Sequence, residues 1–214
     1  MEKCLICGSD THNFTHPKTG VRFHQCQQCE VIFKDNTHYP SRIDEENRYL
    51  EHNNDPSQEG YVNFLTHFID EAVTPFISSG HILDFGSGPT PVLQLLLTNL
   101  GYDVDTYDPF FSPDKPDQEK RYDMITSTEV MEHIHQPKDA LIWMDKHVEK
   151  DGFIALMTLF YPQERQSFFQ WFYIRDLSHV VFFQEKTFQV IGDMMGWNIV
   201  FNDHKRIIVF QKRG

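Results

Sequence analysis

The stretch His81–Leu93, HILDFGSGPTPVL, most constrains what this chain can fold into. Its apolar start predicts a short buried strand, its two glycines a tight turn, and its last residues the start of a helix. A strand, a glycine-rich turn and a helix in this order hold many nucleotide-type cofactors. The stretch therefore predicts an α/β domain with a candidate cofactor site at this turn.

The rest of the chain supports that fold class, because predicted strands and helices alternate along it. Strands are predicted over HILDF, YDVDTYD, YDMITS and GFIALMTL, with helices over PVLQLLLTNLG and PKDALIWMDKHVEK. After an irregular aromatic stretch, EKTFQVIGDMMG predicts a helix, and WNIVFND and RIIVFQK predict two closing strands that pair antiparallel. Such alternation predicts a mostly parallel sheet wrapped by helices. An amphipathic helix precedes it, with one apolar face formed by Tyr61, Phe64, Leu65, Phe68, Ile69 and Ala72.

Acidic and proline residues around the turn indicate which cofactor it holds. Asp84 ends the first strand, and Asp108 ends the next one, where a carboxylate can accept both hydroxyls of a ribose. Pro89 and Pro91 lack the N–H groups that a pyrophosphate needs at a helix N-terminus. Thr90 and Pro91 instead suit the N-cap and first positions of the helix. The pattern favours a ligand with ribose and adenine but no phosphate, such as S-adenosylmethionine, over a dinucleotide. A structural turn without a ligand is the alternative.

All four cysteines lie near the N-terminus, in two CxxC pairs. Two such knuckles at this spacing are typical of a tetrahedral zinc site with four thiolate ligands. The short strand-like segments between and after them predict a zinc ribbon, in which the metal is structural because no ligand position stays open. Disulfides or unligated thiols are the alternative. The predicted zinc ligands are Cys4, Cys7, Cys26 and Cys29.

Charge and hydropathy narrow the classes of partner. The formal net charge is −12, which disfavours a nucleic-acid partner. The chain has no long apolar run that would predict a membrane span, and its N-terminus does not resemble a secretory signal. We therefore expect a cytoplasmic protein. The oligomeric state is left open.

Three motifs, ILDFGSG, TYDP and YDMITSTEVMEHI, resemble the successive motifs of class I SAM-dependent methyltransferases. The last is similar to a strand region of the small-molecule methyltransferases of the ubiquinone-biosynthesis type. The resemblance implies a Rossmann-like α/β fold over residues 60–214, with an antiparallel closing strand. It also covers a zinc ribbon over residues 1–35, and the polar segment 36–59 is predicted to be a linker that can contain a short helix.

The resemblance also implies roles for residues near the turn. Gly86 and Gly88 would let the backbone approach the methionine part of S-adenosylmethionine, Asp84 would hold its ammonium group, and Asp108 its ribose hydroxyls. The pocket near the transferred methyl group would be lined by Ser127, Thr128 and Glu129. Only PFFSPDKPDQEKR separates Asp108 from the next predicted strand, and this is too short for the helix and third strand that the family usually has. We expect a sheet trimmed at that edge.

Two groups of residues are candidates for the acceptor site. The motif EVMEHI supplies Glu129, Glu132 and His133, which one helical turn would cluster. In ubiquinone-type relatives such a set can hold a divalent metal, and the alternative is a pocket-lining or structural role. The aromatic stretch FFQWFYIRDLSHVVFF would overhang the site, with His179 as a general base or substrate-binding residue. In the alternative it is a hydrophobic plug with Arg175 and Asp176 paired at the surface.

The function expected from these features is methyl transfer from S-adenosylmethionine to a small metabolite or sugar-type acceptor. The candidate catalytic residues are Glu129, His133 and His179. A non-catalytic binding protein built on the same two modules is one alternative. RNA methylation is another, and the negative net charge counts against it.

Overall fold

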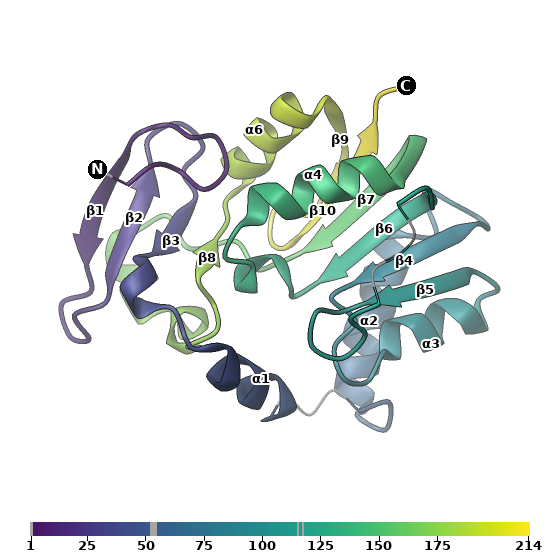
Figure 1. Ribbon diagram of the computed structural model, residues 1–214, viewed down its shortest axis with the longest axis horizontal. Coiled ribbons are helices and arrows are strands. Elements are labelled where there is room, and N and C mark those ends of the chain that lie inside the picture. Colours follow the sequence, from purple (N-terminus) through teal and green to yellow (C-terminus); the bar gives the residue numbers. More distant parts are fainter. Residues whose placement is uncertain (1, 52–54, 115, 117) are drawn as a thin grey trace.

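The computed structural model describes residues 2–51, 55–114, 116 and 118–214, which form two β-sheets (Figure 1). The larger sheet has the strand order β5-β4-β6-β7-β10-β9. Strands β5, β4, β6 and β7 run parallel, and β10 pairs antiparallel with both β7 and β9. This confirms the predicted mostly parallel sheet with an antiparallel closing pair. The strands are β4 (His81–Phe85), β5 (Asp103–Tyr107), β6 (Tyr122–Thr128), β7 (Val148–Met157), β9 (Trp197–Asn202) and β10 (Ile207–Lys212).

Helices cover both faces of the large sheet. Neighbouring strand residues point to opposite faces, so each face presents apolar side chains of its own. On β4, Ile82 packs in the core with α2 and α3, whereas Leu83 belongs to the core that contains α4 and α6. Figure 1 shows α4 and α6 together on one side of this sheet. The helices are α2 (Glu59–Ala72), α3 (Val92–Asn99), α4 (Pro137–His147) and α6 (Glu185–Met195).

The helix ends differ from the sequence prediction by a few residues. Helix α3 begins at Val92, with Pro91 as its N-cap, so the predicted N-cap Thr90 is wrong by one position. The ψ of Pro91 is 69°, outside the helical region, which is why the helix starts one residue later. Helix α4 ends at His147 because Val148 already pairs with Tyr122 of β6.

The sheet edge next to the glycine turn is trimmed, as expected. Strand β5 is the edge strand, and the chain returns from it to β6 on the other side of β4. In residues 109–121, apart from Lys115 and Asp117, which lie outside the described residues, the structure has no helix and no named strand. An isolated bridge between Asp108 and Ser112 closes the turn that follows β5.

The smaller sheet has the order β1-β2-β3-β8, with antiparallel pairing throughout. Its first three strands are β1 (Thr11–Thr15), β2 (Arg22–Cys26) and β3 (Ile32–Lys34), as expected for the N-terminal ribbon. Strand β8 (Val181–Phe182) comes from the aromatic stretch and was not predicted. It lies between the ribbon and the large sheet in Figure 1.

Further helical turns connect the two sheets. Segment 36–59, where the sequence predicted a linker that can contain a short helix, includes η1 (Asn36–His38) and the ten-residue helix α1 (Arg42–Glu51); residues 52–54 lie outside the described residues. The remaining turns are η2 (Met131–His133), α5 (Arg165–Gln170) and η3 (Phe172–Arg175). No helix in the described ranges is both long and apolar enough to cross a membrane.

Candidate functional site

The glycine turn after β4 is held against the ends of two neighbouring strands. The N–H of Gly86 donates to the carbonyl of Tyr107 at the end of β5, at 2.7 Å. Gly86 and Gly88 have φ of 85° and 68°, a conformation that favours glycine. A Cβ on Gly86 would overlap the side chain of Val130, which follows β6, whereas a Cβ on Gly88 would meet no protein atom within 4 Å. Gly86 therefore permits close packing, and Gly88 leaves open space beside the turn.

Asp84, the last but one residue of β4, is a buried carboxyl group that lines the cavity at this turn. Asp84 is only 2% exposed. Burial, followed by the nearby charge of Asp108, raises the pKa of Asp84 to about 7. In the part of the chain that the structure describes, no basic side chain forms an ion pair with Asp84 or Asp108. A bound cation would stabilise the charged form of Asp84.

Asp108, directly after β5, is positioned by three backbone N–H groups. One carboxylate oxygen, Oδ2, accepts from Gly88 at 3.0 Å. The other, Oδ1, accepts from Phe110 at 2.8 Å and from Phe111 at 3.1 Å. These bonds join the glycine turn to the turn after β5 and fix the carboxylate at the cavity wall.

The end of β6 brings two of the three predicted pocket residues to the cavity. Thr128 and Glu129 line it, whereas Ser127 is fully buried in the sheet and is not part of the cavity wall. The alternation of side chains along a strand explains the difference between Ser127 and Thr128.

These residues surround one large cavity of about 960 Å³ at the carboxyl ends of the parallel strands. One part of its wall comes from β4, β5 and the turns that follow them, and we call it the cofactor half after the role expected for it from the sequence. The other part comes from α1, η2 and residues 161–183, which we call the cover segment; this part is named the acceptor half on the same basis. Its volume is near the upper end of the range for ligand pockets, which leaves room for two bound molecules.

Two glutamates and a tyrosine form a buried network in the acceptor half. Tyr173 of the cover segment is within hydrogen-bonding distance of Glu129 Oε2, at 3.1 Å, and of Glu132 Oε1. Burial, followed by the charge of Glu129, raises the pKa of Glu132 to about 8. Glu129 has a φ of 54° and precedes the η2 turn, so these glutamates do not share the helical turn that the sequence predicted. They meet because both reach the same phenol group.

The two candidate histidines also meet at this wall. The ring of His133 lies 4.6 Å from that of His179, centroid to centroid. His133 Nδ1 is 3.1 Å from the carbonyl oxygen of Ser178, and His179 Nδ1 is 2.9 Å from that of Tyr173. The potential ligand atoms of Glu132, His133 and His179 lie within 4.8 Å of one another, so this group could hold a metal ion.

Helix α1 and the cover segment are joined by an ion pair that the sequence did not predict. Arg48 donates from Nε at 2.9 Å and from Nη2 at 2.6 Å to Oδ2 of Asp176. One alternative drawn from the sequence paired Arg175 with Asp176 at the surface. Instead, Asp176 pairs with Arg48, and Arg175 donates to the carbonyl of Gln170. Arg48 and Tyr49 of α1 line the cavity. The polar sequence around them contains no motif that would have predicted a place in the cavity wall.

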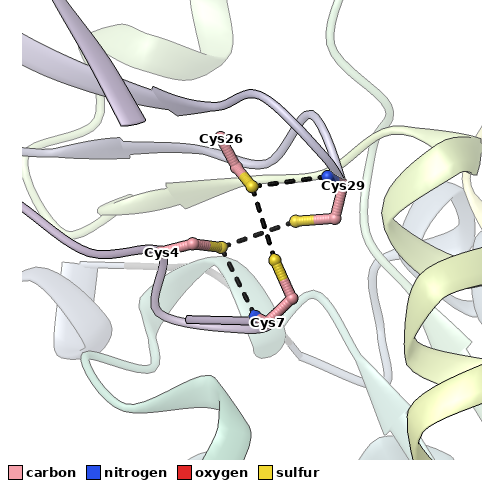
Figure 2. A group of neighbouring side chains, drawn as sticks. All are labelled: Cys4, Cys7, Cys26 and Cys29. Carbon is pink, nitrogen blue, oxygen red and sulfur yellow. Dashed lines mark hydrogen bonds between the residues drawn. The ribbon is translucent and has the colours of Figure 1, made fainter. Parts of the chain in front are cut away.

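The four cysteines form a separate candidate metal centre in the ribbon, with their sulfur atoms directed at a common point (Figure 2). The Sγ atoms of Cys4 and Cys29 are 3.5 Å apart, and those of Cys7 and Cys26 are 3.4 Å apart. Zn–S bonds of about 2.3 Å in a tetrahedron put sulfur atoms roughly 3.8 Å apart, so a small expansion of the cysteine cluster around the ion suffices. Backbone N–H groups in each knuckle also point at a cysteine sulfur, as in Cys29 N to Cys26 Sγ at 3.3 Å. The donor set and geometry fit zinc.

Comparison with known proteins gives a family. A family model described as a methyltransferase domain matches residues 50–201. No curated protein sequence matches the chain significantly.

Solved structures share the fold of the chain at low sequence identity. A SAM-dependent methyltransferase from Archaeoglobus fulgidus is 13% identical, with a TM-score of 0.54 over 81% of this chain and 100% of that one. The 1,6-didemethyltoxoflavin-N1-methyltransferase of Burkholderia thailandensis, with bound 1,6-didemethyltoxoflavin and S-adenosylhomocysteine, is 10% identical. Its TM-score is also 0.54, over 96% of this chain and 100% of that chain.

Proposed function

The chain belongs to the methyltransferase domain family, and from that premise we propose that it transfers the methyl group of S-adenosylmethionine to a small-molecule acceptor. One observation carries the proposal. Two carboxylates, Asp84 and Asp108, flank a glycine turn with positive φ, and all of them line one large cavity at the carboxyl ends of the strands. This is the edge at which ligands bind in open α/β sheets.

The cofactor half suits the charges of S-adenosylmethionine. Asp84 would accept hydrogen bonds from its ammonium group, directly or through water, and Asp108 from its ribose hydroxyls. Gly86 and Gly88 would keep the backbone close to the methionine part. A pyrophosphate at the same place would be repelled by two buried carboxylates, which disfavours a dinucleotide. Ser127 lies behind Thr128 and would act through the strand rather than by touching the cofactor.

The acceptor half would orient the nucleophile and take its proton. When bound, S-adenosylmethionine supplies an activated methyl group, so the protein mainly aligns the acceptor and excludes water. Glu129 is the strongest candidate for the base: its Oε2 is within reach of Tyr173, while its buried Oε1 accepts no hydrogen bond from the described residues. His133 and His179 are further candidates for binding or deprotonating the acceptor, since both line the cavity. An acceptor with an O–H or N–H group fits these residues.

A small metabolite or sugar-type acceptor is favoured over a macromolecule. Helix α1 and the cover segment enclose the acceptor half, and Arg48 joins them by its ion pair with Asp176. The net charge of −12 further disfavours a nucleic-acid acceptor.

The proposal includes a structural zinc ion on the four cysteines. Four thiolate ligands leave no open position, so the ion would stabilise the fold rather than take part in methyl transfer. Metal-binding thiols also suit a reducing, cytoplasmic location. We assign residues 1–35 to the ribbon, 36–59 to the connecting segment and 60–214 to the methyltransferase domain.

Calorimetric titration with S-adenosylmethionine and S-adenosylhomocysteine tests the proposal. We expect the wild-type protein to bind both, and Asp108→Ala to bind at least about tenfold more weakly, since it loses a charged hydrogen-bond acceptor. Asp103→Ala is the matched control, because Asp103 is an exposed carboxylate at the far end of the same strand. Absence of binding by the wild type, or equal binding by Asp108→Ala, would overturn the cofactor assignment.

A further inference from the structure

The cover segment is the part of the cavity wall that contacts the ribbon. Its inner side presents Tyr173 and His179 to the acceptor half. Its strand β8 has two residues and pairs, within the described part of the chain, with β3 of the ribbon. The register places Phe182 opposite Ile32 and Val181 opposite Phe33. A strand of this length needs its partner to remain in place.

Side chains strengthen this backbone pairing. Lys34 of β3 is buried, and its Nζ donates to the carbonyls of Asp176 at 2.9 Å and Leu177 at 3.3 Å. Phe23 of the ribbon packs edge-on against Phe168 of the cover segment, with ring centroids 5.4 Å apart. The cover segment is therefore held by both polar and aromatic contacts to the ribbon.

Two further bonds start at the second cysteine knuckle itself. The carbonyl of Cys29 accepts from Thr187 Oγ1 at 2.9 Å, at the beginning of α6. The carbonyl of Glu30 accepts from the hydroxyl of Tyr161 at 2.6 Å, where the cover segment begins. The start of the cover segment and the helix that follows its end are thus both attached to the second cysteine knuckle.

The other end of this chain of contacts is the EVMEHI motif. The N–H of Val180, next to β8, donates to the carbonyl of Glu132 at 2.8 Å, and Ser178 contacts His133 through its carbonyl oxygen. A displacement of β8 would therefore move the wall that carries Tyr173 and His179. In contrast, the glycine turn is held by bonds that involve neither the ribbon nor the cover segment. Gly86 donates to the end of β5, and Gly88 donates to Asp108.

A ribbon of about 30 residues cannot bury enough apolar surface to fold alone, so bound metal supplies much of its folding free energy. We propose that metal binding by the four-cysteine ribbon forms the acceptor half of the cavity, by holding the cover segment in place through β3 and β8. Loss of the metal releases the cover segment and leaves the cofactor half intact. The inference rests on the proposed function, since it takes this half of the cavity as the acceptor site.

Hydrogen-exchange mass spectrometry on the full-length protein, before and after removal of zinc by a chelator, tests the proposal. We expect amide exchange in residues 165–183 to become at least about tenfold faster, while residues 81–93 keep their protection. The affinity for S-adenosylhomocysteine should change by less than about threefold, because its residues lie in the cofactor half. Unchanged exchange in residues 165–183 would overturn the proposal. Loss of protection in residues 81–93 together with loss of binding would also overturn it, because release would then not be selective.

A variant that keeps the metal separates this coupling from general unfolding. Lys34→Met removes the bonds to the carbonyls of Asp176 and Leu177 but no metal ligand. We expect faster exchange in residues 165–183 at unchanged zinc content. Lys3→Met is the matched control: Lys3 is an exposed ribbon lysine paired with Asp10, and its loss should leave the cover segment protected. Equal exchange in the two variants would contradict the proposed connection. A failure of the wild type to bind S-adenosylhomocysteine would instead count against the proposed function alone.

Discussion

Replacing Gly86 by alanine tests how closely the glycine turn packs against the end of β6. Gly86 has a φ of 85°, and a Cβ at this position would overlap the Cγ atoms of Val130. The left-handed conformation costs a non-glycine residue roughly 1–2 kcal/mol. Forcing an additional carbon into a packed position costs about 1–3 kcal/mol more. We therefore expect Gly86→Ala to lower the free energy of unfolding by about 2–5 kcal/mol.

Two other glycines separate conformational strain from packing. Gly101 has a φ of 95° and Gly88 a φ of 68°, and a Cβ at either would meet no atom within 4 Å. Each alanine variant should lose only the roughly 1–2 kcal/mol due to the backbone. Gly88→Ala should in addition weaken binding of S-adenosylhomocysteine, because Gly88 lines the cavity.

Urea unfolding followed by circular dichroism measures the stabilities, and calorimetry measures binding. If Gly86→Ala proves as stable as Gly101→Ala, the close approach between the turn and Val130 is wrong. If Gly88→Ala binds S-adenosylhomocysteine as tightly as the wild type, the turn does not hold the cofactor.

Three further perturbations have distinct expected results. Because burial raises the pKa of Asp84 to about 7, folding takes up a proton at this group between about pH 4 and 7, and stability falls as pH rises through that window. The stability of Asp84→Asn relative to wild type should therefore increase by up to about 4 kcal/mol from pH 4 to pH 8 in urea titrations, and a constant difference would refute this. Arg48→Met should lower stability by about 1 kcal/mol through the partly exposed pair with Asp176; a double-mutant cycle with Asp176→Asn that shows no coupling would contradict it. Cys29→Ser should reduce the zinc content from about one ion per chain to none, as measured by elemental mass spectrometry, and retained zinc would exclude the four-cysteine site.

The sequence predicted the large sheet and its glycine turn well because their signals are local. Buried parallel strands show as short apolar runs, and Gly86, Gly88 and Asp108 occupy fixed positions relative to strand ends. The trimmed edge was also predictable, since chain length alone excludes a full helix and strand in residues 109–121. The two CxxC pairs predicted the cysteine cluster because their spacing is also a local signal.

The acceptor half was not predictable in the same way, because its contacts join distant parts of the chain. Strand β8 has only two residues, too few for a periodic pattern, and its partner β3 lies in the ribbon. Helix α1 is polar, so its segment resembled a linker, yet Arg48 reaches Asp176 far along the chain. Tyr173 was one aromatic residue among many until the fold placed it between two glutamates.

A crystal structure of the protein with S-adenosylhomocysteine tests the central claim most directly. We predict that the ligand lies along the glycine turn, with its amino group toward Asp84 and its ribose hydroxyls at Asp108, while its sulfur atom faces Glu129 and the acceptor half. A ligand bound elsewhere, or one whose ribose makes no contact with Asp108, would contradict the assignment of this turn as the site of the methyl donor.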